Sequence, residues 1–245
     1  MKRNLVVPLL ILRIFLNTST STWSHRSKIA GRILAKYFFR SLGGLNRLLQ
    51  PKINFYIKPG YHHASKSSSF DDSSNTDEWQ KEVYIFAASL AKERNYSSVI
   101  DLGCGSGFKL LHYLGFCQTT GVETGRTYEW LKQNHPDHQW LLYEKINPSG
   151  LKTDLIICSD VIEHIKNPDE LIGFIRSMQS QCIIFSTPER DAIAGQNDYG
   201  PPENTSHYRE WNADEFRNYI SQWFHIEEQR IFNARSVTQV IVAKK

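Results

Sequence analysis

Four side chains with acid–base chemistry fall in two places in the sequence. Asp160, Glu163 and His164 follow an apolar run at spacing i, i+3 and i+4, and His207 lies in the polar stretch 191–212. On one helical turn the first three would share a face. A neutral imidazole can take a proton from a substrate, whereas carboxylates and imidazoles together can hold a divalent ion.

Three interpretations of these residues follow. His164 and His207 can act as bases, the group can bind a metal, or Glu163 and His164 can be structural hydrogen-bonding residues that fix a loop. We assign His164 and His207 as catalytic and assign no metal ligand.

The element that must position this chemistry is a glycine-rich turn. Residues 99–102 form a short β-branched and apolar run typical of a buried strand, and glycines follow at 103, 105 and 107. Residues 109–114 then favour a helix. Strand, glycine turn and helix together make a nucleotide-type pocket, because glycine lets a ligand lie against the main chain. The alternative is a tight turn with no ligand.

The spacing G-x-G-x-G, with an acid just before the first glycine, resembles the first motif of class I S-adenosylmethionine-dependent methyltransferases. The resemblance implies S-adenosylmethionine as cofactor. It also implies that one wall of the cofactor site is formed by Asp101, Gly103, Cys104, Gly105 and Gly107. The second motif, Ser159-Asp160-Val161, follows a predicted strand at 154–158 and resembles the small-molecule, ubiquinone-biosynthesis type of the same family. We therefore add Ser159, Asp160 and Val161 to the cofactor-binding residues.

A further acid ends the second predicted strand, residues 118–123. Glu123 follows Asp101 by 22 positions, and a carboxylate at this place can accept hydrogen bonds from both ribose hydroxyls. A solvated acid at the end of a strand is the alternative. For the adenine contact, Ile146 and Asn147 are the candidates.

The remaining pattern predicts an α/β fold. Further strands are expected at 140–142, 182–186, 224–231 and 237–243, with helices at 127–134, 169–178 and 214–221. The family resemblance implies a Rossmann-like sheet of seven strands in the order 3-2-1-4-5-7-6. The sheet is mostly parallel with the last strand antiparallel, and helices cover both faces. We place the methyltransferase domain at 76–245, with Thr76 as a helix N-cap, after a basic extension and connector at 1–75.

Basic and acidic residues are unevenly distributed along the chain. Residues 1–70 hold twelve Lys or Arg and no acid, which leaves 17 basic and 25 acidic residues in the rest. Residues 26–50 read as a basic helix that either docks on the core or lies on an anionic membrane; nucleic acid is not expected. The apolar run 5–12 is too short to span a bilayer.

The four cysteines form no C-x-x-C pair, which favours reduced thiols and a cytoplasmic location.

Function follows from these observations as an expectation. The chain is predicted to methylate a small-molecule or glycan acceptor, most simply at a hydroxyl oxygen, beneath a lid formed by residues 191–212. A non-catalytic Rossmann-like binding module is one alternative. A nicotinamide-dependent oxidoreductase is a second, which the glycine spacing disfavours.

Overall fold

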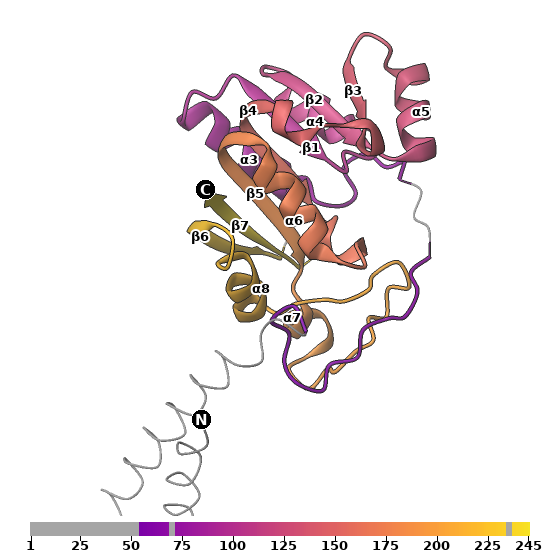
Figure 1. Cartoon of the computed structure of the whole chain (residues 1–245), viewed down its shortest axis with the longest axis vertical. Helices are drawn as coiled ribbons and strands as arrows, with labels where there is room; N and C mark the ends of the chain where they lie inside the picture. The colour runs from indigo at the N-terminus through magenta and orange to yellow at the C-terminus, as the bar shows by residue number, and fades with distance from the viewer. Residues whose placement is uncertain (1–53, 69–71, 234–236) are drawn as a thin grey trace, which may run out of the picture. The chain divides into compact units, whose positions relative to one another are not determined.

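The computed structural model describes residues 54–68, 72–233 and 237–245, all within the compact unit Pro51–Lys245. Its centre is a seven-stranded sheet in the order β3-β2-β1-β4-β5-β7-β6 (Figure 1). Strand β7 runs antiparallel to both of its neighbours, whereas the pairs from β3 to β5 are parallel. The predicted architecture and strand order are confirmed. The strands are β1 (Ser98–Leu102), β2 (Gln118–Glu123), β3 (Gln139–Leu142), β4 (Lys152–Ser159), β5 (Gln179–Pro188), β6 (His225–Phe232) and β7 (Thr238–Lys244).

Helices cover both faces of the sheet. Side chains of the central strands alternate between two apolar cores: Ile156 and Cys158 pack on the face of α6 and α8, and Leu155 and Ile157 on the face of α3, α4 and α5. Both faces of β4 are therefore buried, as in other parallel sheets. The helices are α3 (Lys81–Glu93), α4 (Phe108–Leu114), α5 (Gly125–Asn134), α6 (Pro168–Ser177), α7 (Arg190–Ala194) and α8 (Ala213–Ile220).

Two helix N-caps were predicted, and the structure confirms one of them. The Asn212 side chain accepts a hydrogen bond from the Glu215 amide and completes a capping box, so the predicted start of α8 is confirmed. The predicted N-cap at Thr76 is wrong, because α3 begins at Lys81 after Gln80, whose φ of 62° is left-handed. Residues 72–80 instead cross the carboxyl edge of the sheet as an irregular segment.

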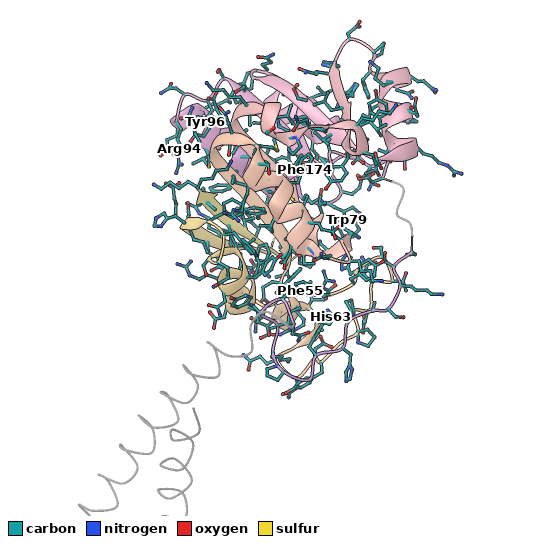
Figure 2. All side chains as sticks on the ribbon, viewed as in Figure 1. Phe55, His63, Trp79, Arg94, Tyr96 and Phe174 are labelled. Atoms are coloured by element: carbon teal, nitrogen blue, oxygen red, sulfur yellow. The ribbon has the colours of Figure 1, made fainter. Side chains whose placement is uncertain are left out.

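The connector 54–68 packs against the long segment that follows α7. Backbone amides of His62 and Ala64 donate to the carbonyls of Tyr199 (2.8 Å) and Tyr208 (2.9 Å), and Ser68 donates to Thr205 (2.9 Å). Figure 2 shows Phe55 and His63 within this region, and their rings meet edge to face at 6.0 Å. The segment expected to be a polar lid is therefore tied along its length to the connector.

A buried arginine lies at the base of this segment. Both terminal nitrogens of Arg190 donate to the Glu215 carboxylate, at 2.7 and 3.1 Å, and one also reaches Asp191 at 3.1 Å. The side chain is fully buried and lies 5.2 Å from the Tyr61 ring centroid. Arg190, which follows β5, therefore contacts α8 through its ion pair with Glu215 and the connector through the ring of Tyr61.

All four cysteines are free, as predicted. Within the described residues, no helix has the length and hydropathy needed to cross a bilayer. The predictions for the basic helix at 26–50 and the apolar run at 5–12 fall outside the described residues.

Candidate active site

The glycine turn after β1 is closely covered. Gly103 has φ of +75°, and a Cβ there would overlap the side chain of Val161. Gly105 has φ of +57°, and a Cβ there would overlap the Asp72 carboxylate. Both positions therefore require glycine, for backbone conformation and for space. Val161 of the second motif, Ser159-Asp160-Val161, therefore packs directly on the glycine turn of the first motif.

Asp101 lies beneath this turn and is fully buried. Tyr84 of α3 donates its hydroxyl to Oδ2 at 2.8 Å, while Oδ1 has no hydrogen-bond partner among the described residues. Burial raises the pKa of Asp101 to about 7, with Asp72 adding to the shift and Lys109 opposing it. Asp101 therefore has one carboxylate oxygen available to a donor on a ligand.

Glu123, at the end of β2, faces the same turn. Its carboxylate accepts hydrogen bonds from the amides of Gly105 (2.8 Å) and Thr124 (3.0 Å). Burial raises the pKa of Glu123 to about 7, and the negative charge of Asp72 adds to this. The structure thus brings together Asp101, the glycines and Glu123, as predicted from their spacing.

Two other predicted cofactor residues turn their side chains away from the turn. The buried Cys104 thiol packs into the core shared with Trp140 and Leu131, so only its backbone can contribute to the wall of the site. The Ser159 hydroxyl is 2.8 Å from the Ser186 hydroxyl on β5.

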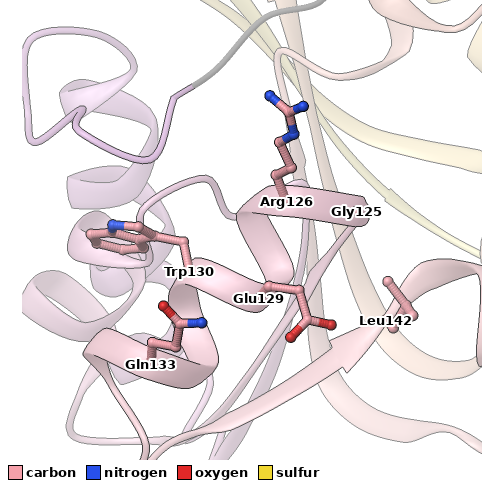
Figure 3. A pocket seen from close by; sticks show the side chains of 6 residues that line it. All are labelled: Gly125, Arg126, Glu129, Trp130, Gln133 and Leu142. Atoms are coloured by element: carbon pink, nitrogen blue, oxygen red, sulfur yellow. The ribbon is translucent and has the colours of Figure 1, made fainter.

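Two cavities lie next to α5, and one of them also reaches Ser106 of the glycine turn. One of about 430 Å³ runs along α5 to the end of β3, and Figure 3 shows the Glu129 side chain directed toward Leu142 there. The other, of about 490 Å³, lies between residues 73–76 and the two helices α4 and α5.

The side chain of Asn147 accepts hydrogen bonds from Ser149 and caps a short 3₁₀ turn, so Asn147 as the adenine contact stays a prediction.

The second group of residues lies on the loop that follows β4. Asp160 has a left-handed φ of 51°, so it is not part of a helical turn with Glu163 and His164, and the expected shared face does not form at Asp160. Ser186 donates to its carboxylate at 2.6 Å. Burial raises the pKa of Asp160, while hydrogen bonds from Ser186 and the Gln80 side chain lower it. Such conformations in non-glycine residues are strained and concentrate at functional sites.

His164 and His207 are in contact although 42 residues lie between them in the sequence. Their ring centroids are 4.7 Å apart and the rings are nearly perpendicular. His164 Nδ1–H donates to the Ser206 carbonyl at 2.9 Å, which leaves the lone pair on Nε2. Burial, together with the neighbouring His207, lowers the pKa of His164 to about 4, against the opposing effect of the hydrogen bond to Ser206. His164 is therefore neutral near pH 7, and the structure brings the two histidines together, while their catalytic role stays a prediction.

The surroundings of His207 complete this group. Its Nδ1–H donates to the Glu210 carboxylate at 2.6 Å, and the Asn204 amide donates to its Nε2 at 3.0 Å. Both ring nitrogens of His207 are therefore engaged, and the orientation of its ring is fixed beside His164.

Glu163 lies next to both histidines and is fully buried. Neither carboxylate oxygen forms a hydrogen bond of good geometry with a described residue. Burial and the charge of Asp160 raise its pKa well above the usual range. One ligand atom each from Glu163, His164 and His207 lie within 4.8 Å of one another, a spacing that can hold a divalent ion. Asp160, the other acid of the predicted group, is not one of these three.

Sequence reasoning missed several residues of the site. Glu210 follows His207 by three positions, so the histidine–carboxylate pair was visible as H-x-x-E. Asp72 and Gln80 had no such signal, because they meet the site only through the fold of residues 72–80.

The sheet order and a glycine turn flanked by two acids define the Rossmann-like class of nucleotide-type binding folds. A family model described as a methyltransferase domain matches residues 74–238. The chain belongs to this family of class I, S-adenosylmethionine-dependent methyltransferases, as the motifs implied. The nicotinamide oxidoreductase alternative is therefore wrong.

Solved structures show the same fold at low sequence identity. The chain is similar to magnesium protoporphyrin IX methyltransferase (ChlM) from Synechocystis PCC 6803 with bound SAH (14% identity, TM-score 0.52, covering 67% of this chain and 82% of that one). It is also similar to the methyltransferase domain of bacterial CtHen1 (22%, 0.53, 67% and 97%) and to the plantazolicin methyltransferase BpumL with SAH (12%, 0.54, 69% and 85%). No curated protein matches the sequence significantly.

Proposed function

We propose that this methyltransferase modifies a hydroxyl oxygen of a small-molecule or glycan acceptor. The observation that supports this most directly is the pair formed by His164 and His207. His164 follows Val161, which covers the glycine turn, by three residues. A base close to the cofactor suits a hydroxyl, which must lose a proton when it is methylated.

The residues around the glycine turn fit the cofactor. Among the described residues the buried Asp101 Oδ1 lacks a hydrogen-bond partner, and the Glu123 carboxylate accepts a hydrogen bond from the Gly105 amide. The three glycines adopt the positive φ values that the tight turn requires. We infer that Asp101, Gly103, Gly105, Gly107 and Glu123 hold S-adenosylmethionine, with backbone contacts from Cys104 and the loop 159–161. When bound, this cofactor supplies a methyl carbon made electrophilic by its sulfonium.

The histidine pair is suited to accept the proton of the acceptor. Neutral His164 keeps a lone pair on Nε2, which can bind the hydroxyl and orient its oxygen. We infer that His164 takes the proton, while Glu210 and Asn204 hold the His207 ring in place beside it.

A divalent ion is a second candidate for the same residues. Glu163 is buried and forms no side-chain hydrogen bond of good geometry with the described residues, which is costly for a carboxylate, and a cation among Glu163, His164 and His207 would satisfy it. Such an ion would lower the pKa of a coordinated acceptor hydroxyl and make a histidine base unnecessary.

The rim of the site supports an acceptor with a ring. Trp79 is 54% exposed and directly precedes Gln80, whose side chain hydrogen-bonds Asp160. In Figure 2 it lies between the sheet and the segment 190–212. An exposed indole offers a flat apolar face to a sugar or an aromatic ring.

Transfer of labelled methyl groups tests this assignment. The full chain is incubated with methyl-labelled S-adenosylmethionine and panels of glycosides, sugar alcohols, phenols, amines and carboxylic acids. We expect label in ether products only. Label confined to amine or acid products would overturn the hydroxyl assignment, and a chain that binds the cofactor but methylates nothing would favour a binding module.

Replacing Glu123 by alanine should weaken cofactor binding by about 1.5–3 kcal/mol, the scale of a lost charged hydrogen bond. Titration calorimetry with S-adenosylhomocysteine measures it. The matched control is Glu93→Ala, an exposed residue at the C-terminal end of α3, which should bind normally. Unchanged affinity in Glu123→Ala would remove this residue from the site.

We also propose that residues 1–50 strengthen association with anionic membranes. The support is compositional: twelve basic residues and no acid precede Asp71, interleaved with apolar residues. Full-length chain should co-sediment with vesicles containing phosphatidylserine, and less so as salt rises. A chain starting at Pro51 should bind them weakly and keep its cofactor affinity; equal sedimentation of both would refute the proposal.

A further inference from the structure

The segment that follows α7 is fastened along the loop that follows β4. The Tyr208 amide donates to the Glu163 carbonyl at 2.9 Å, and His164 Nδ1–H donates to the Ser206 carbonyl at 2.9 Å. These two hydrogen bonds hold the stretch that carries His207 against the turn that carries His164. A buried arginine adds a further attachment beside them.

Arg209 makes this attachment with its side chain. Only 2% of the residue is exposed, and its Nη1 and Nη2 atoms donate to the carbonyls of Ile165 (2.7 Å) and Lys166 (2.6 Å). These carbonyls belong to the two residues that directly follow His164 in the sequence. The guanidinium therefore fixes the backbone immediately after the imidazole.

The third donor of the same guanidinium reaches the connector 54–68. Arg209 Nε donates to His63 Nδ1 at 3.2 Å. Because Nδ1 accepts this bond, the proton of the neutral His63 ring lies on Nε2, which donates to the side-chain oxygen of Asn54. The guanidinium carbon also lies 4.6 Å from the centroid of the Phe55 ring. One planar group thus joins the connector to the loop of His164.

This set of contacts requires arginine. Its Nε, Nη1 and Nη2 donors lie in one rigid plane and point in different directions, so they can reach three acceptors in two segments. A lysine at position 209 would carry the same charge on one nitrogen at the end of a flexible chain. It could not hold the two carbonyls and the His63 ring in the same geometry.

We propose that Arg209 is a positioning residue for methyl transfer, which fixes the backbone after His164 so that this imidazole meets the acceptor hydroxyl. This rests on the proposed role of His164 as the base. Arg209 acts through the loop, since its hydrogen bonds to Ile165, Lys166 and His63 all end on protein atoms. A base works only within hydrogen-bond reach of the proton that it accepts, so a small shift of the ring slows the transfer.

The test is a double-mutant cycle with His164, measured with the acceptor found by label transfer. In Arg209→Lys, kcat should fall about 10–100-fold, the cost of a displacement of about 1 Å, while acceptor KM and cofactor affinity change less than about twofold. In the His164→Ala background, where no imidazole is left to position, Arg209→Lys should lower the residual kcat less than about twofold. The matched control is Arg217→Lys on the exposed side of α8, which should behave as wild type.

A second variant covers the case in which Arg209→Lys does not fold. His63→Phe keeps a ring against Phe55 and removes the acceptor of Arg209 Nε. It should lower kcat about threefold, a smaller loss because the two bonds to the loop remain. This loss too should vanish in the His164→Ala background.

A direct measurement separates failure of this role from failure of the proposed function. Nitrogen-15 NMR of the imidazoles reports which ring nitrogen of His164 carries the proton. The wild-type chain should show the Nδ1–H form that the Ser206 carbonyl fixes, and Arg209→Lys should show both forms.

If His164→Ala keeps full turnover, the assignment of the base fails, and the NMR signal still decides whether Arg209 fixes the ring. Three results would overturn the positioning role. They are an equal loss of kcat with and without His164, a loss confined to acceptor KM, and an unchanged Nδ1–H form in Arg209→Lys.

Discussion

Alanine in place of His164 or His207 should reduce methyl transfer by about 10²–10⁴-fold, the range for loss of a general base. The two rings meet at 4.7 Å, and the hydrogen bond to Glu210 fixes the His207 ring, so each ring helps to position the other. Turnover is measured with the acceptor found by label transfer. Cofactor affinity should stay near wild type, because neither ring contacts the glycine turn.

The exposed His225 on the edge strand β6 supplies the matched control, and His225→Ala should keep full turnover. The metal candidate gives a different pattern. In that case a chelator abolishes activity, Mn²⁺ restores it, and Mn²⁺ binding seen by electron paramagnetic resonance is lost in His164→Ala. If both alanine variants keep full turnover and the chelator has no effect, the site works by aligning the acceptor alone.

Arg190→Met should lower the free energy of unfolding by about 3–5 kcal/mol, because removing one partner of a buried ion pair leaves the other charges uncompensated. Glu215, Asp191 and Asp198 all lie within 4 Å of this guanidinium. Methionine keeps much of the side-chain volume, so the loss is mainly electrostatic. The midpoint of urea denaturation measures the effect.

Arg230→Met provides the comparison for an exposed pair. Arg230 is about half exposed and bonds Glu228 on the same strand, so its loss should change stability by less than about 0.5 kcal/mol. Similar midpoints for the two variants would show that the buried network adds little to stability.

Much of the fold could be predicted from local pattern. The run Val99–Leu102 ends at glycine, and Glu123 ends the next strand, so both strands and their shared edge follow from residue type and spacing. Asn212 was recognisable as a cap because the capping box lies within four residues. These features depend on neighbours in sequence, which is the information that a single sequence contains.

The features that sequence missed depend on distant contacts. Thr76 has the composition of a cap, but Gln80 takes a left-handed conformation and its side chain meets Asp160, which delays the helix to Lys81. Asp72 sits in a serine-rich stretch typical of a loop, and only the turn fastened through Ser106 places it on Gly105. Tertiary contacts outweighed local propensity at both positions.

The pairing of the connector with the segment after α7 also determines when the two halves of the site can form during synthesis. Lys58 bonds Glu215 across 157 residues, and Ser68 meets Thr205 across 137. On the ribosome, residues 54–68 are synthesised early, and they can form these contacts only after almost the whole chain has been made. The cofactor side closes through residues 72–161, because Val161 covers Gly103 of the glycine turn. A nascent chain therefore contains its whole donor-binding half before His207 and Glu210 of the histidine half emerge, and the connector is the last early segment to find its place.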